Sequence, residues 1–291
     1  MAGRKAYSLR IRPDGRFVVV QFTDLHLGSS AATDRRTRSV IEAVLQAEAP
    51  DLVALTGDIL EGQRAADPRA ALRAGLAPVL ERGLPWAPIL GNHDDEGRFG
   101  RRRVFGFLRS LPGCLGRPGP RGVSGFGNYV LRIQGSERAT AFVFHMFDSH
   151  AYAPQGFGTY AWIRADQIDW YRRSRADPHA PALAFLHIPL PEWEQAWREG
   201  WNKRGHRHEP ACCPAVNSGL FAAFLERGDV VGVFCGHDHL NDYEATLHGI
   251  RLVYGRATGH GGYGRPGFPR GARVIELREG FRGFETRVVA P

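Results

Sequence analysis

The sequence has little cysteine, and its four cysteines form no metal or redox motif. No two of them have the C-x-x-C spacing of a structural zinc site or a redox centre. Cys212 and Cys213 are adjacent, which is poor geometry for a disulfide between them. We therefore expect a protein of a reducing compartment rather than a disulfide-stabilised one.

Long apolar runs are also missing. No segment approaches the roughly 20 apolar residues that are needed to cross a bilayer. Residues 1–16 contain no apolar stretch of the kind found in a signal peptide. We therefore expect a cytoplasmic protein with no membrane partner.

The chain lacks long blocks of like charge, although its formal net charge is +8. The basic residues are mostly arginines, scattered along the sequence. A basic protein attracts anions, which suits a phosphorylated small molecule or a phosphoprotein as substrate. The charge allows a nucleic-acid partner without indicating one, and a generally arginine-rich proteome would explain it equally well.

Hydrophobic residues make up 43% of the 291 residues, which is enough for a sizeable core. Strand-like and helix-like runs alternate from residue 17 to residue 289, with no obvious linker and no internal repeat. We therefore expect a single domain over residues 1–291.

The first third of the chain alternates short buried strands with amphipathic helices. This rhythm predicts a parallel sheet with right-handed crossovers. The strands are expected at residues 17–22, 52–55 and 86–90, and the helices at 34–47 and 68–82. The second half is richer in strands, expected at residues 128–133, 140–147, 182–186, 230–235, 244–247, 251–254 and 273–277. Helices are expected at residues 164–175 and 218–227, and loops at 112–127, 199–217 and 255–271.

Polar clusters follow five of these strands at their carboxyl ends. In open α/β sheets ligands bind in the crevice beyond those ends, so side chains far apart in sequence can meet there. The clusters are Asp24 with His26, Asp58, Asn92 with His93 and Asp94, His187, and His237 with His239.

Seven of these side chains are metal donors, and a shared Asp58 would give each of two metals four protein contacts. Imidazole and carboxylate ligands without thiolate suit Mn, Fe or Zn, either divalent or as a mixed-valence pair. Two metals about 3.5–4 Å apart can clamp the attacking and leaving oxygens of an in-line displacement and supply a hydroxide nucleophile. His93 would remain free as a proton donor.

Each cluster taken alone also has a structural explanation. Asp24 with His26 could form a turn or a helix cap, Asp58 a turn, and His187 a satisfied core histidine. Their order along the chain, each at a strand end, favours the dinuclear interpretation. His260 and Tyr263 lie in a glycine-rich loop after the fifth cluster, where close backbone approach is easy, and are candidate substrate contacts.

The five clusters together resemble the signature of the calcineurin-like metallophosphoesterases. The resemblance implies an α/β fold in which a two-sheet β-sandwich is flanked by helices, the metallo-dependent phosphatase fold. It also implies that His93 acts as general acid, oriented by Asp94. The implied ligands are Asp24, His26, Asp58 and His239 for one metal, and Asp58, Asn92, His187 and His237 for the other.

A closer likeness covers most of the chain. Residues 125–129, 147–149, 184–191, 217–221 and 236–242 resemble the small purple-acid-phosphatase-like proteins, which include the fungal cell-cycle phosphatase group. True purple enzymes carry a tyrosine three residues after the aspartate of the second cluster. Here that residue is Glu61, and His26 is present instead, so neither the charge-transfer colour nor an obligatory ferric ion is expected.

The expected function is therefore metal-dependent hydrolysis of a phosphomonoester. A phosphodiesterase of the cyclic-nucleotide or nuclease type is the alternative, because the same clusters serve those branches. A non-catalytic metal-binding scaffold is the remaining alternative, but such a protein should lack ligands or the histidine next to Asn92, and this chain lacks neither.

Overall fold

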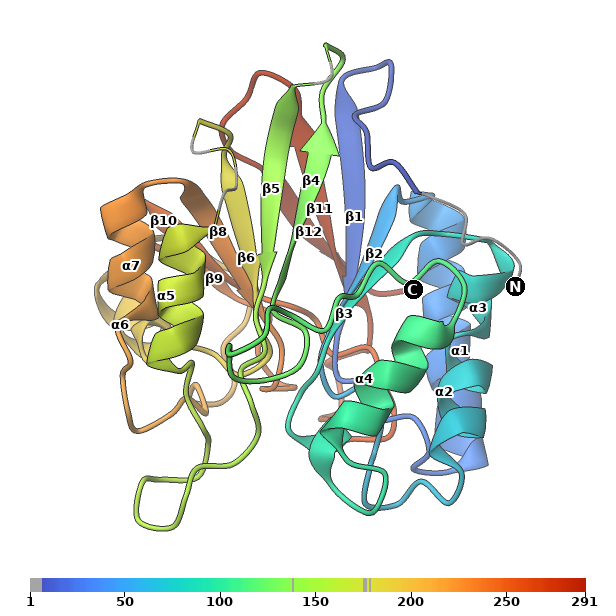
Figure 1. The fold of residues 1–291 in the computed structure, drawn as a ribbon. Helices are drawn as coiled ribbons and strands as arrows, with labels where there is room; N and C mark the ends of the chain where they lie inside the picture. Colours follow the sequence, from blue (N-terminus) through green and yellow to red (C-terminus); the bar gives the residue numbers. More distant parts are fainter. Residues whose placement is uncertain (1–6, 138, 175–176, 178) are drawn as a thin grey trace.

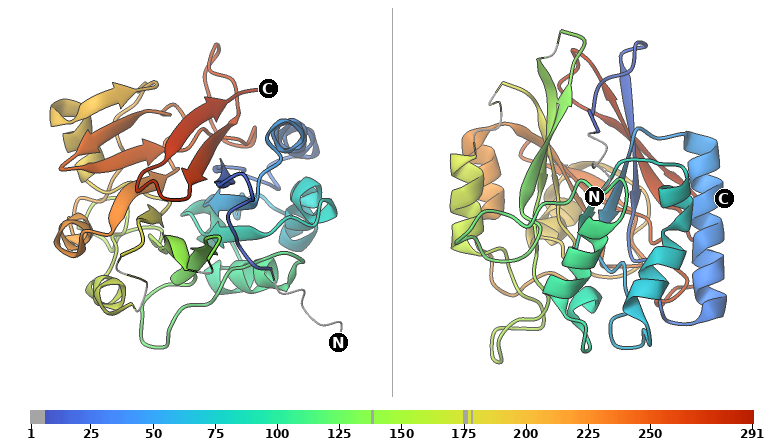
Figure 2. Two further views of the ribbon diagram at one scale, coloured as in Figure 1. Left: turned by 90° about the horizontal axis from the view of Figure 1, so that it is seen from above. Right: turned by 45° about the vertical axis from the view of Figure 1, so that its right-hand side comes forward.

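A computed structural model describes residues 7–137, 139–174, 177 and 179–291. Within these residues two β-sheets lie face to face, with α1–α4 on one side and α5–α7 on the other (Figures 1 and 2). The expected two-sheet sandwich flanked by helices is confirmed. No helix in the described part of the chain is long and apolar enough to cross a membrane.

The first sheet has five strands in the order β12-β11-β1-β2-β3. The predicted parallel pairing is confirmed, because β1 runs parallel to β2 and β2 runs parallel to β3. The strands are β1 (Arg16–Phe22), β2 (Leu52–Thr56), β3 (Trp86–Ile89), β11 (Ala272–Arg278) and β12 (Glu285–Val289).

The second sheet has seven strands in the order β4-β5-β6-β8-β10-β9-β7. Its central strands β5, β6, β8 and β10 are parallel, and antiparallel strands flank them. The strands are β4 (Tyr129–Gln134), β5 (Thr140–Met146), β6 (Ala182–Phe185), β7 (Trp201–Arg204), β8 (Val230–Cys235), β9 (Glu244–Leu247) and β10 (Ile250–Tyr254).

The helices are α1 (Ala31–Glu48), α2 (Pro68–Gly75), α3 (Ala77–Glu81), α4 (Arg101–Ser110), α5 (Ala165–Arg173), α6 (Glu192–Glu199) and α7 (Leu220–Arg227), with a short 3₁₀ turn η1 (His93–Asp95). The single helix expected over residues 68–82 was wrong. Pro78 divides it into α2 and α3, because proline lacks the N–H that would continue the helical ladder. The loop expected over residues 199–217 contains β7, whose four side chains are all exposed.

The two sheets share a hydrophobic core. Val20 and Ile275 of the first sheet belong to the same buried cluster as Phe185 and Phe234 of the second. Gln21 links the sheets at the end of β1, since its side-chain amide donates to Thr56 Oγ1 at 2.8 Å and to the Cys235 carbonyl at 3.0 Å. This packing brings the carboxyl ends of the parallel strands of both sheets to one end of the molecule, the lower end in Figure 1.

Candidate metal centre

The loops after β1 and β2 pair with each other beyond the sheet. The Asp24 N–H donates to the Gly57 carbonyl at 3.1 Å, and the His26 N–H donates to the Asp58 carbonyl at 2.9 Å. Asp24, His26 and Asp58 have φ angles of 55°, 47° and 47°, in the left-handed region that non-glycine residues rarely adopt. Such backbone strain concentrates at functional sites, and here it holds three of the predicted donors in adjacent turns.

Glycines precede several donors because the site leaves no room for a side chain. A Cβ on Gly91 would lie 2.1 Å from Asp58 Oδ1, and a Cβ on Gly57 would lie 2.4 Å from His187 Nδ1. A Cβ on Gly262 would lie 2.2 Å from His239 Cε1. These contacts explain why backbone from three loops can close around one cluster.

One group of buried donors combines the first and last of the predicted clusters. Asp24 Oδ1 lies 3.3 Å from His239 Nε2, and His26 Nε2 lies 3.1 Å from the same His239 nitrogen. The ligand atoms of these three residues lie within 4.8 Å of one another. Such short separations between lone-pair donors are what a shared cation requires.

A second group adjoins the first through Asp58. Asp58 Oδ2 lies 3.2 Å from His187 Nε2 and 3.8 Å from His26 Nε2. His237 Nδ1 lies 3.3 Å from His187 Nε2, and these three second-group residues again fall within 4.8 Å. One carboxylate thus stands between two donor groups.

The side chain of Asn92 has a buried oxygen that could bind a cation. Its Oδ1 is buried with no hydrogen-bond partner among the described residues, whereas its Nδ2 donates to Tyr152 Oη at 3.1 Å. His237 Nε2 is likewise buried and unpartnered within the described part of the chain. Buried polar atoms normally have partners, so the unpartnered Asn92 oxygen and the clustered lone pairs fit a pair of metal ions, with His237 offering Nδ1 rather than Nε2.

The charges of the cluster are strongly coupled. Burial would raise the pKa of Asp24, but the adjacent His239 outweighs it and lowers that pKa to about 2. Burial would lower the pKa of His187, but the Asp58 carboxylate raises it to about 9. The ionised carboxylates of Asp24 and Asp58 are therefore stabilised by positive charge beside them. A metal cation would supply this charge as well as a protonated imidazole does.

His93 lies at the edge of the cluster, and one sequence expectation about it is wrong. Its Nδ1 pairs with Glu96 Oε2 at 3.0 Å, and its backbone N–H donates to Asp58 Oδ1 at 2.8 Å. Asp94 does not orient this ring. The Asp94 carboxylate instead accepts from the Leu60 N–H at 2.8 Å and the Gly91 N–H at 2.7 Å, because its side chain points back under the two loops.

The two candidate substrate contacts lie in different surroundings. The Tyr263 ring stacks on His239 with a centroid separation of 4.1 Å, and Tyr263 Oη donates to Glu209 Oε1. Its side chain is 51% exposed, so it borders the cluster. His260 instead donates its backbone N–H to Thr37 Oγ1 and lines a separate pocket with Arg36 and residues 264–265 and 267–270.

Around the cluster lie Tyr152, Tyr160 and Glu96, which no sequence motif pointed to, and Glu61, whose contact with His26 was not expected. Glu61 accepts from His26 Nδ1, and Tyr152 donates to Glu96 as well as contacting Asn92. Tyr160 meets the His237 ring edge-on at 4.4 Å. The spacing of Glu96 three residues after His93 within one turn could have revealed its role.

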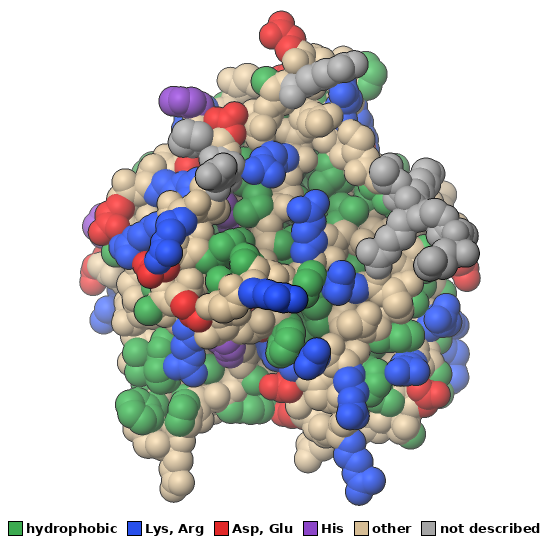
Figure 3. Space-filling view, in the orientation of Figure 1, with side chains coloured by type: hydrophobic (Ala, Val, Ile, Leu, Met, Phe, Trp, Pro, Cys, Tyr) green, Lys and Arg blue, Asp and Glu red, His purple; other side chains and the backbone are tan. Residues whose placement is uncertain are grey.

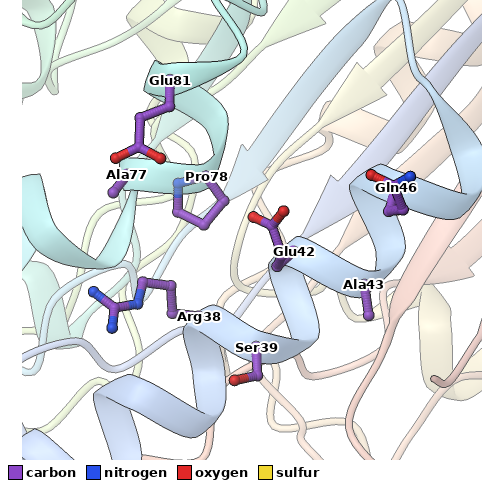
Figure 4. Close-up of a pocket in the computed structure, with 8 residues that line it drawn as sticks. All are labelled: Arg38, Ser39, Glu42, Ala43, Gln46, Ala77, Pro78 and Glu81. Atoms are coloured by element: carbon purple, nitrogen blue, oxygen red, sulfur yellow. The ribbon is translucent and has the colours of Figure 1, made fainter.

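A groove elsewhere on the described surface lacks this chemistry. The groove between α1 and α3 measures about 460 Å³, but Arg38, Glu42, Gln46 and Glu81 are its longest polar side chains and no cluster residue reaches it (Figure 4). Arg and Lys side chains are spread widely over the face shown in Figure 3 rather than gathered in one patch. The cluster at the strand ends is thus where the unusual chemistry of the molecule is concentrated.

Comparison with known proteins identifies the family and the fold. Residues 17–241 match the family model described as calcineurin-like phosphoesterase. The chain is 34% identical over 310 residues to a protein of Arabidopsis thaliana named "Probable inactive purple acid phosphatase 14", covering 93% of this chain and 77% of that one. It is 33% identical to phosphatase DCR2 of Saccharomyces cerevisiae, covering 86% of this chain and 49% of that one. A dimetal phosphatase from Danio rerio has the same fold, with a TM-score of 0.63 at 13% identity and coverage of 94% and 98%.

Proposed function

The chain belongs to the calcineurin-like phosphoesterase family, and from that premise we propose that it is an active phosphomonoesterase. Membership makes it a metal-dependent hydrolase of phosphate esters. The proposal adds the class of ester and the roles of individual residues. The observation that supports it most is Asp58, a single buried carboxylate within 4 Å of imidazole nitrogens from both donor groups.

The donor set divides naturally into two metal sites. Two cations held there would neutralise phosphate charge and activate water at neutral pH. Mn, Fe or Zn would suit the mixture of imidazole, carboxylate and amide oxygen. We assign Asp24, His26, Asp58 and His239 to one site, and Asp58, Asn92, His187 and His237 to the other.

His93 is placed to assist the leaving group. Its side chain is 34% exposed, so the imidazole borders the open side of the cluster. Burial would lower its pKa, but in the metal-free protein Asp58 and Glu96 raise it. Glu96 is not among the assigned metal ligands, so its carboxylate would still favour the protonated ring that a general acid needs once metals are bound. Because Nδ1 is paired with Glu96, Nε2 is the atom available to a leaving oxygen.

Two alternatives remain open to test. The phosphomonoester assignment is supported by the phosphatase names of several relatives, whereas one relative, from Psychrobacter arcticus, is named a probable cyclic nucleotide phosphodiesterase. Some relatives are named inactive, which would suit a scaffold. Six of the seven expected donors fall into two adjoining groups, and this supports our proposal of catalysis on a phosphorylated small molecule or phosphoprotein.

The test compares an aryl phosphate with a bis-aryl phosphate as substrates of the metal-loaded protein. We expect the monoester to be turned over faster, and His93→Ala to lower its kcat by about 10²–10⁴-fold. Asp58→Asn should lower both turnover and the number of bound metals. Faster hydrolysis of the diester, or unchanged turnover in both variants, would refute the assignment.

A further inference from the structure

A basic pocket lies beside the metal cluster. It measures about 380 Å³ and is lined by Arg36 from α1 and by residues of the 260–270 segment. Its lining includes three arginines and one histidine but no aspartate or glutamate. The four basic side chains are Arg36, His260, Arg265 and Arg270.

The arginines of this pocket have no carboxylate partner. The side chains of Arg36 and Arg265 make no hydrogen bond or ion pair with any described residue, and both residues are exposed. Arg270 donates to the carbonyl oxygens of Gly262 and Tyr263 alone among the described acceptors. Elsewhere in the fold, arginines such as Arg256 are paired with carboxylates.

The neighbouring positive charges lower the pKa values of two groups that line the pocket. The pKa of Arg270 is lowered first by burial and also by repulsion from Arg256 and Arg36, while Asp24 of the metal cluster opposes the shift. The pKa of His260 is lowered by burial and by Arg36 and Arg270. An anion in the pocket would relieve this repulsion.

The pocket begins close to a proposed metal ligand. His239 Nδ1 donates to the Tyr263 carbonyl at 2.9 Å, and Arg270 donates to the same oxygen. The Arg270 guanidinium is therefore no more than two hydrogen-bond lengths from the His239 ring. A ligand bound at the metals and extending past Tyr263 would meet the arginines next.

We propose that this pocket binds a second phosphate group of the substrate, so that the preferred substrates are bisphosphates of which one ester is hydrolysed at the metals. This inference rests on the proposed phosphomonoesterase function and deepens it. Arginine suits the role because its planar guanidinium binds phosphate oxygens through two parallel hydrogen bonds. Three such groups without a carboxylate partner among the described residues would also attract dianionic ligands to this side of the cluster.

The test uses 1,n-alkanediol bisphosphates of increasing chain length, each beside the alkyl monophosphate of the same length, with metal-loaded protein. At one alkane chain length we expect the bisphosphate to have a KM about tenfold or more below that of the matching monophosphate, with a similar kcat. The lower KM would come from charge-assisted hydrogen bonds between the second phosphate and the arginines of the pocket. The variant Arg36→Gln/Arg265→Gln should lose this advantage and keep its kinetics on alkyl monophosphates. Arg35→Gln/Arg38→Gln is the charge-matched control, because it removes two positive charges from α1 outside the pocket.

Three results would overturn the inference: no favoured spacing, an advantage that survives in the pocket variant, or an equal loss in the control. Turnover of an aryl phosphate by the wild type separately reports the proposed function. If no ester were hydrolysed, calorimetric binding of the bisphosphates to wild type and pocket variant would still decide whether the pocket holds phosphate.

Discussion

His26 and Glu61 are joined by a buried hydrogen bond of 2.8 Å between Nδ1 and Oε2. Glu61 occupies the position at which purple enzymes carry a tyrosine, and His26 is the donor that replaces it. Glu61 and His26, the two residues that differ from the purple enzymes, are therefore joined by one hydrogen bond. The carboxylate fixes the ring so that Nε2 faces His239 and Asp58.

We expect Glu61→Ala to weaken metal binding by about 10–100-fold, as the loss of a carboxylate behind a ligating histidine usually does. Glu61→Gln, which keeps one acceptor oxygen, should be affected less. Metal affinity would be measured by competition with a chromophoric chelator, alongside turnover. The exposed Glu42→Ala is a control, and equal affinities of Glu61→Ala and wild type would contradict the positioning role.

Asp94 is expected to act on the loops rather than on His93. Its carboxylate accepts two buried backbone N–H groups, from Leu60 and Gly91. Asn at this position has one acceptor oxygen, so one N–H would lose its partner at a cost of about 1–3 kcal/mol. We therefore predict that Asp94→Asn lowers the free energy of unfolding in urea, and that it lowers metal affinity as the Asp58 and Asn92 loops loosen.

A contrasting result would restore the expectation from the sequence. If Asp94→Asn kept wild-type stability and metal affinity but lost turnover as severely as His93→Ala, then Asp94 would serve the proton donor after all. Asp95→Asn, one residue along, provides a comparison because its carboxylate accepts from the Arg101 N–H outside the cluster.

The sequence predicted the part of the site that depends on strand ends. Asp24, Asp58 and His187 each follow a short run of buried apolar residues, and parallel strands bring such positions to one edge. Contacts between side chains of different loops could not be predicted in this way. Glu61 reaches His26 only because the two loops pair beyond the sheet, which no local pattern encodes.

Local chemistry explains the other differences. The break between α2 and α3 follows from Pro78, which the amphipathic spacing of residues 68–82 concealed. Strand β7 has four exposed side chains, so it shows none of the apolar alternation from which strands are predicted. The orientation of Asp94 depends on backbone N–H groups that a side-chain motif does not display.

Glu96 holds two side chains at the edge of the cluster, His93 and Tyr152. We predict that Glu96→Gln lowers kcat on an aryl phosphate, since the ring loses the charge that favours its protonated form. In a His93→Ala background the same change should have almost no further effect, because coupled residues are non-additive. Tyr152→Phe removes the contact of Glu96 with Tyr152 and leaves its contact with His93. Fully additive losses of kcat for Glu96→Gln and His93→Ala would refute the coupling between Glu96 and His93.

Arg101 and Asp148 form a buried ion pair that supports the loop bearing Asn92. Arg101 Nε lies 3.1 Å from both Asp148 oxygens, and the guanidinium also donates to the carbonyls of Leu90 and Gly91. Removing one partner would leave a buried charge uncompensated, at a cost of about 3–5 kcal/mol. Asp148→Asn should therefore unfold at much lower urea than wild type at pH 7.

The pair also sets a pH dependence. Burial would raise the pKa of Asp148, but Arg101 outweighs it and holds that pKa below its usual value near 3.8. A lowered folded-state pKa gives stability that is present above the unfolded value and is lost as pH falls through the folded one. Chelator-treated wild type should thus lose stability below about pH 4 more steeply than Asp148→Asn does. Asp169→Asn breaks an exposed ion pair with Arg173 and is the control, because it should change neither the urea stability nor the acid profile much. If wild type and Asp148→Asn lost stability in parallel as the pH fell, the Arg101–Asp148 pair would not govern acid stability.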